Sequence, residues 1–276
     1  MTDIVRSLEA AVALIEDGMR VVVAPDHSGV AMEATRELIR RGAKKLRLLT
    51  LPASSLQADL LIGAGSLAEI ETSAVSLGEL GTGPRFAAAA LAGDGLVIKD
   101  ATCPVLHAAV QAGEKDVPFA LLRGVIGSDL LKVRPDWKVI ENPFAAQSVS
   151  DPILAVPAIK PDVALFHAPF ADRQGNVWVG RRRELFTMAH ASARTVVTVE
   201  AIHDGNLLEN GILAGATIPG FYIDAVAVVP KGAWPLRFMN RYPEDSPHLA
   251  EYMRLAVSEL GFRRYLERYV FERRAA

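Results

Sequence analysis

One short segment, "APDHSGVAM" at residues 24–32, gathers side chains that could do acid–base chemistry. It follows a run of three valines and leads into a helical pattern, an outline typical of loops that hold a ligand with backbone N–H groups. Glycines usually allow the close approach, but only Gly29 is present here. Asp26, His27 and Ser28 could supply donors or acid–base groups instead, because histidine titrates near neutrality. Ser28 and Asp26 are also ordinary helix caps, so both interpretations stay open.

The second candidate is Cys103, the only cysteine of the chain, in "IKDATCPVLHAAV". A thiol at the start of a helix becomes a nucleophile when its pKa is lowered. Lone cysteines are more often small buried hydrophobic residues, and this alternative also stays open. A single cysteine cannot form an internal disulfide, which suits a reducing cytoplasm.

Alternating strands and helices are predicted to position these residues. Short apolar runs such as "VVV", "ALF" and "VVTV" lack a two-residue alternation, so they should be strands buried on both faces of a mainly parallel sheet. The fold class predicted is a layered open α/β sheet with helices on both faces. Helices are predicted at 3–16, 30–41, 104–114 and 184–193. Strands are predicted at "RVVVA", "KLRLLTL", "ADLLIGAG", "GLVIKD", "DVALFHA", "GNVWVG", "RTVVTVEAI" and "YIDAVAVVP".

The chain is predicted to form one domain over residues 1–276. The proline-rich stretch 132–161 is interpreted as a long connection that crosses one edge of the sheet. The segment 246–274 should form a pair of helices that is broken at Gly261.

Composition excludes several classes of protein. With 276 residues, 50% of them hydrophobic and 22% charged, the chain can bury a large core. Its 30 basic and 32 acidic residues give no electrostatic case for nucleic acid or an anionic membrane as partner. No signal peptide or membrane-spanning run is apparent, so a cytoplasmic protein is expected. No cluster has metal-ligand spacing, and "GAGS" at 63–66 is too short for a nucleotide fingerprint.

Several segments together resemble the α subunit of family I coenzyme A transferases, in particular the glutaconate CoA-transferase branch. The resemblance covers nearly the whole chain and is strongest from about 156 to 235. It rests on "PAIKPDVALFHAPFADRQGNVWVG", "MAHASARTVVTVEAI" and "TIPGFYIDAVAVVPKGAWP", supported by "DGMRVVVA", "ADLLIGAGSL" and "VPFALLRGVIGSDL".

The resemblance implies an α subunit that pairs with a β subunit of similar fold in a heterodimer or heterotetramer. Such enzymes move coenzyme A between carboxylates, and the β subunit supplies the glutamate nucleophile. An acyl-CoA thioester is then the substrate, and no tightly bound cofactor is expected. The alternatives are a CoA-thioester hydrolase of the same superfamily, including one that opens a steroid-derived ring, or a non-catalytic CoA-ester-binding or scaffold subunit.

The family pattern after the first strand is Gly-Gly-aromatic, where this chain has Ala24, Pro25 and Asp26. In relatives this loop closes on the thioester, where backbone N–H groups can stabilise an oxyanion. Pro25 has no N–H, so at least one donor is lost. The resemblance therefore adds a third interpretation, a loop that has lost its catalytic part.

Other site residues follow from the same resemblance. Cys103 stands where the ring-opening hydrolases carry a glutamate and the glutaconate transferases an amide. Ser54 and Ser55 lie where relatives line the acyl pocket, although a plain turn is equally consistent. The run Arg181–Arg183 could meet a phosphate of coenzyme A, and a solvated face or subunit contact is the alternative.

Two further residues receive structural interpretations. His167, at a strand end, is predicted to be a structural histidine. Glu209, in "ENG", resembles the β-subunit nucleophile motif but is interpreted as part of a surface turn.

Overall fold

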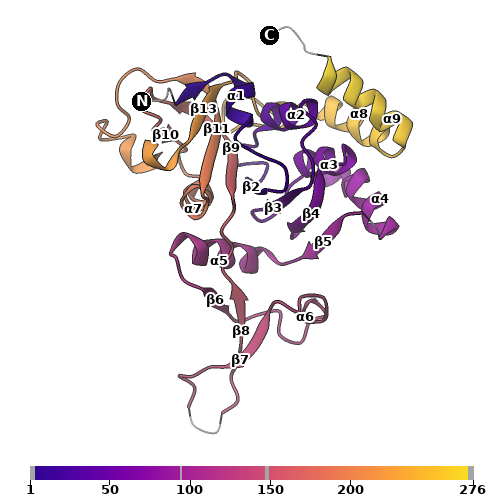
Figure 1. The fold of residues 1–276 in the computed structure, drawn as a ribbon, viewed down its shortest axis with the longest axis vertical. Coiled ribbons are helices and arrows are strands. Elements are labelled where there is room, and N and C mark those ends of the chain that lie inside the picture. The colour runs from indigo at the N-terminus through magenta and orange to yellow at the C-terminus, as the bar shows by residue number, and fades with distance from the viewer. Residues whose placement is uncertain (1–3, 94, 147–148, 273–276) are drawn as a thin grey trace.

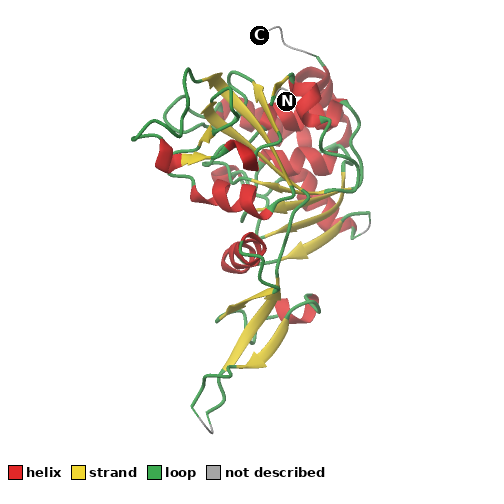
Figure 2. Cartoon of the chain, turned by 60° about the vertical axis from the view of Figure 1, so that its left-hand side comes forward, coloured by secondary structure: helices red, strands yellow, loops and turns green. Residues whose placement is uncertain are grey.

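The computed structural model describes residues 4–93, 95–146 and 149–272. Within these ranges, a ten-stranded, mainly parallel sheet forms the body, and a three-stranded antiparallel sheet projects from it as an arm (Figures 1 and 2). The eight strands on the main path run in the order β1-β13-β11-β9-β2-β3-β4-β5, and two short strands, β10 and β12, pair beside β9. The predicted mainly parallel α/β sheet is confirmed.

The body strands are β1 (Val5–Arg6), β2 (Arg20–Val23), β3 (Leu46–Thr50), β4 (Leu67–Thr72), β5 (Val97–Asp100), β9 (Val163–Ala171), β10 (Val177–Trp178), β11 (Arg194–Ile202), β12 (Thr217–Ile218) and β13 (Ala225–Val228). The helices are α1 (Leu8–Val12), α2 (Met32–Arg40), α3 (Leu56–Gly63), α4 (Pro84–Ala92), α5 (Cys103–Glu114), α7 (Arg183–Ala191), α8 (Ser246–Ala256) and α9 (Glu259–Leu266). Short 3-10 turns occupy Gly78–Leu80, Ala214–Ala216 and Gly220–Tyr222, and a π turn occupies Glu267–Phe271.

Both faces of the body sheet are covered. Val21 and Val23 of β2 belong to one core, which includes residues of α1, α2, α3, α8 and α9. Val22, between them, belongs to the second core, which includes residues of α5 and α7. Successive side chains of a strand point to opposite faces, so a run of three valines requires a helix layer on each side.

The arm consists of β6 (Phe119–Leu122), α6 (Leu130–Val133), β7 (Lys138–Glu141) and β8 (Pro152–Pro157). Part of the stretch 132–161 is thus regular structure, and its interpretation as a plain connection was wrong. β8 pairs antiparallel with both β6 and β7. Its two prolines stand at its ends, where a missing N–H disturbs the ladder least, and this proline content disguised the strand.

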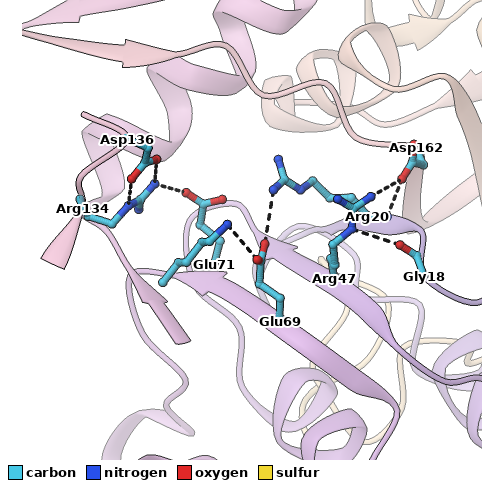
Figure 3. A network of polar contacts seen from close by, with 9 residues as sticks. Gly18, Arg20, Arg47, Glu69, Glu71, Arg134, Asp136 and Asp162 are labelled. Atoms are coloured by element: carbon cyan, nitrogen blue, oxygen red, sulfur yellow. Dashed lines mark hydrogen bonds and ion pairs between the residues drawn. The ribbon is translucent and has the colours of Figure 1, made fainter. Parts of the chain in front are cut away.

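A charged network joins the arm to the body (Figure 3). Arg134 is buried, bonds Glu71 of β4 at 2.6 Å and Asp136 at 2.8 Å, and stacks on Trp137 with 4.2 Å to the ring centroid. Two pockets, of about 250 and 530 Å³, open on this side of the sheet beside Arg20. The cations of this region are paired with carboxylates, so we assign no ligand to either pocket.

Three other element predictions need correction. The segment 3–16 does not form one helix, because Val5 and Arg6 pair with β13 and α1 starts only after the Ser7 cap. The run "ADLLIGAG" lies mostly in α3, because a short apolar run fits a buried helix as well as a strand.

The C-terminal segment, predicted over 246–274, is described up to residue 272. It is interrupted at Val257–Ser258 instead of Gly261, because Ser258 caps α9 by accepting a hydrogen bond from the Gly261 N–H at 3.1 Å. Tyr252 of α8 donates to the buried Asp59 of α3 at 2.5 Å and so fixes this segment to the body.

Candidate active site

The loop that joins β2 to α2, residues 24–31, lies where the sheet reverses its order. From β2 the chain proceeds to β3, β4 and β5 on one side, whereas from β9, the neighbour of β2, it proceeds to β11 and β13 on the other. In open α/β sheets, ligands bind outside the carboxyl ends of the strands at such a reversal. The topology alone therefore marks the 24–31 loop as the candidate site.

Gly29 brings this loop into close contact with β9. Its carbonyl accepts a hydrogen bond from the His167 N–H at 2.8 Å, and its φ is +118°. A Cβ at this position would lie 2.0 Å from the His167 carbonyl oxygen. Both the conformation and the contact require glycine, so the one glycine left in the loop has a structural reason.

The loop still presents backbone donors. Pro25 has none, but its carbonyl accepts the Ser28 N–H at 2.9 Å and closes a turn. Among the described residues, no group accepts a hydrogen bond from the N–H of His27 or of Gly29. Two donors within one turn are therefore free to meet an anionic oxygen.

Asp26 carries the most perturbed carboxyl group of the loop. Burial raises the pKa of Asp26 to about 6, the Ser55 hydroxyl and N–H oppose this, and the charge of Glu244 adds to it. Within the described chain, neither Asp26 Oδ1 nor Ser55 Oγ has a partner in hydrogen-bond geometry. Asp26 can therefore gain or lose a proton close to neutral pH, beside the loop donors.

Ser28 is fully buried and points into the protein. Its hydroxyl forms a short hydrogen bond with Glu184 Oε1 in the first turn of α7. Burial lowers the pKa of the nearby His107 of α5, and the charge of Glu184 opposes this. Neither Glu184 nor His107 was among the residues predicted from sequence, because they lie far along the chain from the loop.

The remaining predicted residues of this region have separate positions. His27 is exposed. Ser54 is buried, donates its N–H to the Ala74 carbonyl at 3.1 Å and accepts from the Ala58 N–H at 3.3 Å. Ser55 is buried next to Asp26. The structure thus brings Asp26 and Ser55 together, while Ser54 shapes the β3–α3 turn.

Cys103 is the first residue of α5, at the carboxyl end of β5, and its thiol is exposed. Its Sγ lies 3.5 Å from Ser73 Oγ. β5 is three strands away from β2, so the thiol does not contact the 24–31 loop. His107 follows one helical turn later, about 6 Å along α5, and connects this helix with the Glu184 cluster.

A buried polar network supports the loop from below. His167 bonds Thr198 Oγ1 and Glu200 Oε1, each at 2.8 Å, and Tyr242 donates to the same Glu200 oxygen at 2.9 Å. Burial lowers the pKa of His167, and Glu200 opposes this. Both ring nitrogens have partners, as expected for a structural histidine.

Other features recognised in the sequence lie outside this cluster. Glu209 lies in an exposed turn, in which Asn206 Nδ2 donates to its carboxylate at 2.9 Å. Arg183, next to Glu184, places its guanidinium 5.5 Å from the centre of the Phe186 ring. In the ranges that the structure describes, no group of three His, Cys, Asp or Glu residues is arranged to hold a metal ion, and no helix has the length and apolarity to cross a membrane.

Comparison with known proteins identifies the family. The sequence profile of the coenzyme A transferase family matches residues 5–229. The chain therefore belongs to the coenzyme A transferase family.

Named relatives agree with this assignment. A 3-oxoadipate CoA-transferase subunit from Pseudomonas knackmussii is 32% identical over 98% of this chain and 94% of that protein. A protein of Archaeoglobus fulgidus is also 32% identical, and the chain spans 60% of its length. The cholesterol ring-cleaving hydrolase IpdA subunit of Rhodococcus jostii is 24% identical over 96% of this chain and 90% of that protein.

Two solved structures share the fold. Glutaconate coenzyme A-transferase from Acidaminococcus fermentans superposes with a TM-score of 0.88, at 24% identity, over 98% of this chain and 90% of that chain. A cysteine-to-serine variant of the decarboxylase AibA/AibB superposes with a TM-score of 0.80, at 28% identity, over 96% of this chain and all of that chain. The 3-oxoadipate CoA-transferase relative is named as one subunit of its enzyme, which implies that such a chain works with a partner subunit.

Proposed function

We propose that this chain is the α subunit of a CoA-transferase that acts on an acyl-CoA thioester together with a β subunit. The observation that carries the proposal is the position of the 24–31 loop. It lies at the reversal of the sheet, with two unoccupied backbone donors and a carboxyl group that titrates near neutrality. Family membership and the 3-oxoadipate CoA-transferase relative support the same assignment.

In this proposal the thioester carbonyl oxygen faces the N–H groups of His27 and Gly29. A carboxylate of the β subunit attacks the thioester carbon, and the two donors stabilise the negative charge that develops on the oxygen. The C–S bond then breaks, which leaves an acyl anhydride on the β subunit and releases CoA thiolate. The thiolate attacks the glutamyl carbonyl of the anhydride and frees the first carboxylic acid, and CoA is then held as an enzyme thioester.

Asp26 has a role within this scheme. It is buried beside Ser55, and part of it is protonated near pH 6. A protonated Asp26 can donate to a carboxylate that enters or leaves the site, and an ionised one repels it. We propose that Asp26 makes exchange of the two acids dependent on pH, while Ser55 borders the acyl group.

The test uses the chain co-produced with a β-type partner, and 3-oxoadipyl and glutaconyl esters belong in the panel of CoA thioesters. A transferase exchanges CoA with a free carboxylic acid, and hydroxylamine or borohydride traps an acyl or CoA enzyme on the partner. A pair that consumes thioester without acid acceptor and yields no trapped enzyme is not a transferase.

A hydrolase is the second candidate, and Asp26 is the observation that favours it. An ionised carboxylate at neutral pH can take a proton from water that attacks the thioester or an activated ring carbon. The ring-cleaving hydrolase subunit among the relatives is consistent with this chemistry. Incorporation of ¹⁸O from labelled water into every product molecule, without CoA transfer to an added acid, distinguishes the hydrolase from the transferase. A complex that binds CoA esters without converting any of them leaves the scaffold alternative.

A further inference from the structure

We propose that Glu184 is a positioning residue for the reaction, because it fixes the 24–31 loop through Ser28. The inference rests on the function proposed above for this loop. Glu184 belongs to the first turn of α7 and Ser28 to the loop after β2, and 156 residues separate them in the sequence. Their hydrogen bond ties the loop to a helix on one face of the sheet.

The burial of Ser28 determines the kind of role. Its relative exposure is 0%, and its hydroxyl is directed at Glu184, so it cannot contact a substrate directly. A buried hydroxyl needs a partner, and a carboxylate is a strong one. Ser28 therefore holds the backbone between His27 and Gly29, which are the residues whose N–H groups face no acceptor in the described chain.

A second attachment makes the geometry complete. Gly29 is held from the other side by the hydrogen bond between the His167 N–H and its carbonyl. The loop is thus fixed on β9 by Gly29 and on α7 by Ser28, and the two free donors lie at these attachment points. A displacement of about 1 Å in such donors can cost roughly 100-fold in rate. His107 packs beside Glu184 and limits the space into which its side chain could turn away.

The same two helices provide a matched control. Glu114 of α5 and His190 of α7 form a second contact, with 3.4 Å between Glu114 Oε1 and His190 Nδ1. This pair joins α5 to α7 as the Glu184 cluster does, but it does not touch the 24–31 loop. Glu114→Ala therefore reports the effect of loosening the helices, and Glu184→Ala reports that effect plus release of the loop.

The experiment measures turnover of the α–β complex with an acyl-CoA. Glu184→Ala should lower kcat/KM by roughly 10- to 100-fold, mainly through kcat, because the donors act on the charge of the transition state. Glu184→Gln keeps an acceptor for Ser28 and should stay within about threefold of wild type. Ser28→Ala should resemble Glu184→Ala, and the double variant should be no worse than either single one. Equal effects of Glu184→Ala and Glu114→Ala, additive losses in the double variant, or failure of Glu184→Gln to restore turnover would each overturn the inference.

Hydrogen exchange separates this inference from the function on which it rests. Amides of residues 24–31 should exchange faster in Glu184→Ala than in wild type, and at an unchanged rate in Glu114→Ala. This readout needs no substrate. If the wild-type complex converts no CoA ester, the proposed function fails while the exchange data still decide whether Glu184 holds the loop.

Discussion

Replacement of Asp26 by asparagine should make the protein more stable at neutral and alkaline pH and leave it unchanged in acid. In the folded protein, burial raises the pKa of this carboxyl from 3.8 to about 6. The folded state therefore binds the proton more tightly than the unfolded state, and stability falls as the pH rises from about 4 to about 6. The difference between the two values corresponds to about 3 kcal/mol at about 1.36 kcal/mol per pKa unit.

Asparagine has a similar shape and no charge, so it avoids the cost of burying the ionised form. We expect Asp26→Asn to be more stable than wild type by up to about 3 kcal/mol above pH 7, which corresponds to roughly 5 to 10 °C in Tm for a chain of this size. The gain should shrink through the window from pH 6 to pH 4 and vanish below it.

The assay is thermal or urea unfolding of wild type and Asp26→Asn from pH 4 to pH 8.5, with Asp129→Asn as control. Asp129 is exposed and pairs with Lys132, so its replacement should change stability by less than about 1 kcal/mol. A difference between wild type and Asp26→Asn that does not vary with pH, or a variant that is less stable at pH 8, would refute the burial argument. In the activity assay, the same variant should lose the pH dependence near pH 6.

Three further predictions concern other parts of the fold. Gly29→Ala places a methyl group 2.0 Å from the His167 carbonyl and should cost roughly 2 to 5 kcal/mol together with most activity, whereas Gly18→Ala, also at positive φ but facing open space, should cost roughly 1 to 2 kcal/mol in the same unfolding assay. Arg134→Met leaves Glu71 buried without its cation and should cost roughly 3 to 5 kcal/mol by urea unfolding; adding Glu71→Leu should recover most of it, and a double variant as unstable as the single one would contradict this. The exposed Cys103 thiol should react with iodoacetamide in the folded protein; if the thiol lines the CoA-ester cleft, bound acyl-CoA should slow that reaction at least severalfold, and an unchanged rate would place it outside the cleft.

The layered sheet could be predicted because its strands are buried on both faces. Runs such as Val21–Val23 have no polar alternation, and only a sheet covered by two helix layers explains them. The arm could not be predicted in the same way. β8 pairs with β6 and β7, which lie well before it in the chain, and the local pattern of a short strand bounded by prolines does not reveal such partners. The helix α3 was missed for a related reason, since an apolar run of eight residues carries no periodicity that decides between helix and strand.

The candidate site was predicted in its loop and missed in its supports. Asp26, Ser28 and Gly29 belong to one segment, and the strand–loop–helix pattern around them is visible in the sequence. Glu184 and His107 reach the loop only because α5 and α7 lie on the same face of the sheet. A glutamate in the first turn after three arginines was the only signal, and an acidic residue there is also an ordinary feature of helix starts. The raised pKa of Asp26 likewise depends on burial that no local pattern contains.

The altered loop is best understood by which glycine it keeps. The sequence alone indicates a loop that has lost two glycines and with them its backbone donors. In the structure, Pro25 gives up an N–H but its carbonyl closes the turn to Ser28, and the free donors belong to His27 and Gly29. Glycine is required at position 29, because any side chain there would collide with β9. The loop therefore keeps the one glycine that its path across the sheet demands, and the substitutions at Ala24 and Pro25 leave two donors free to meet a thioester oxygen.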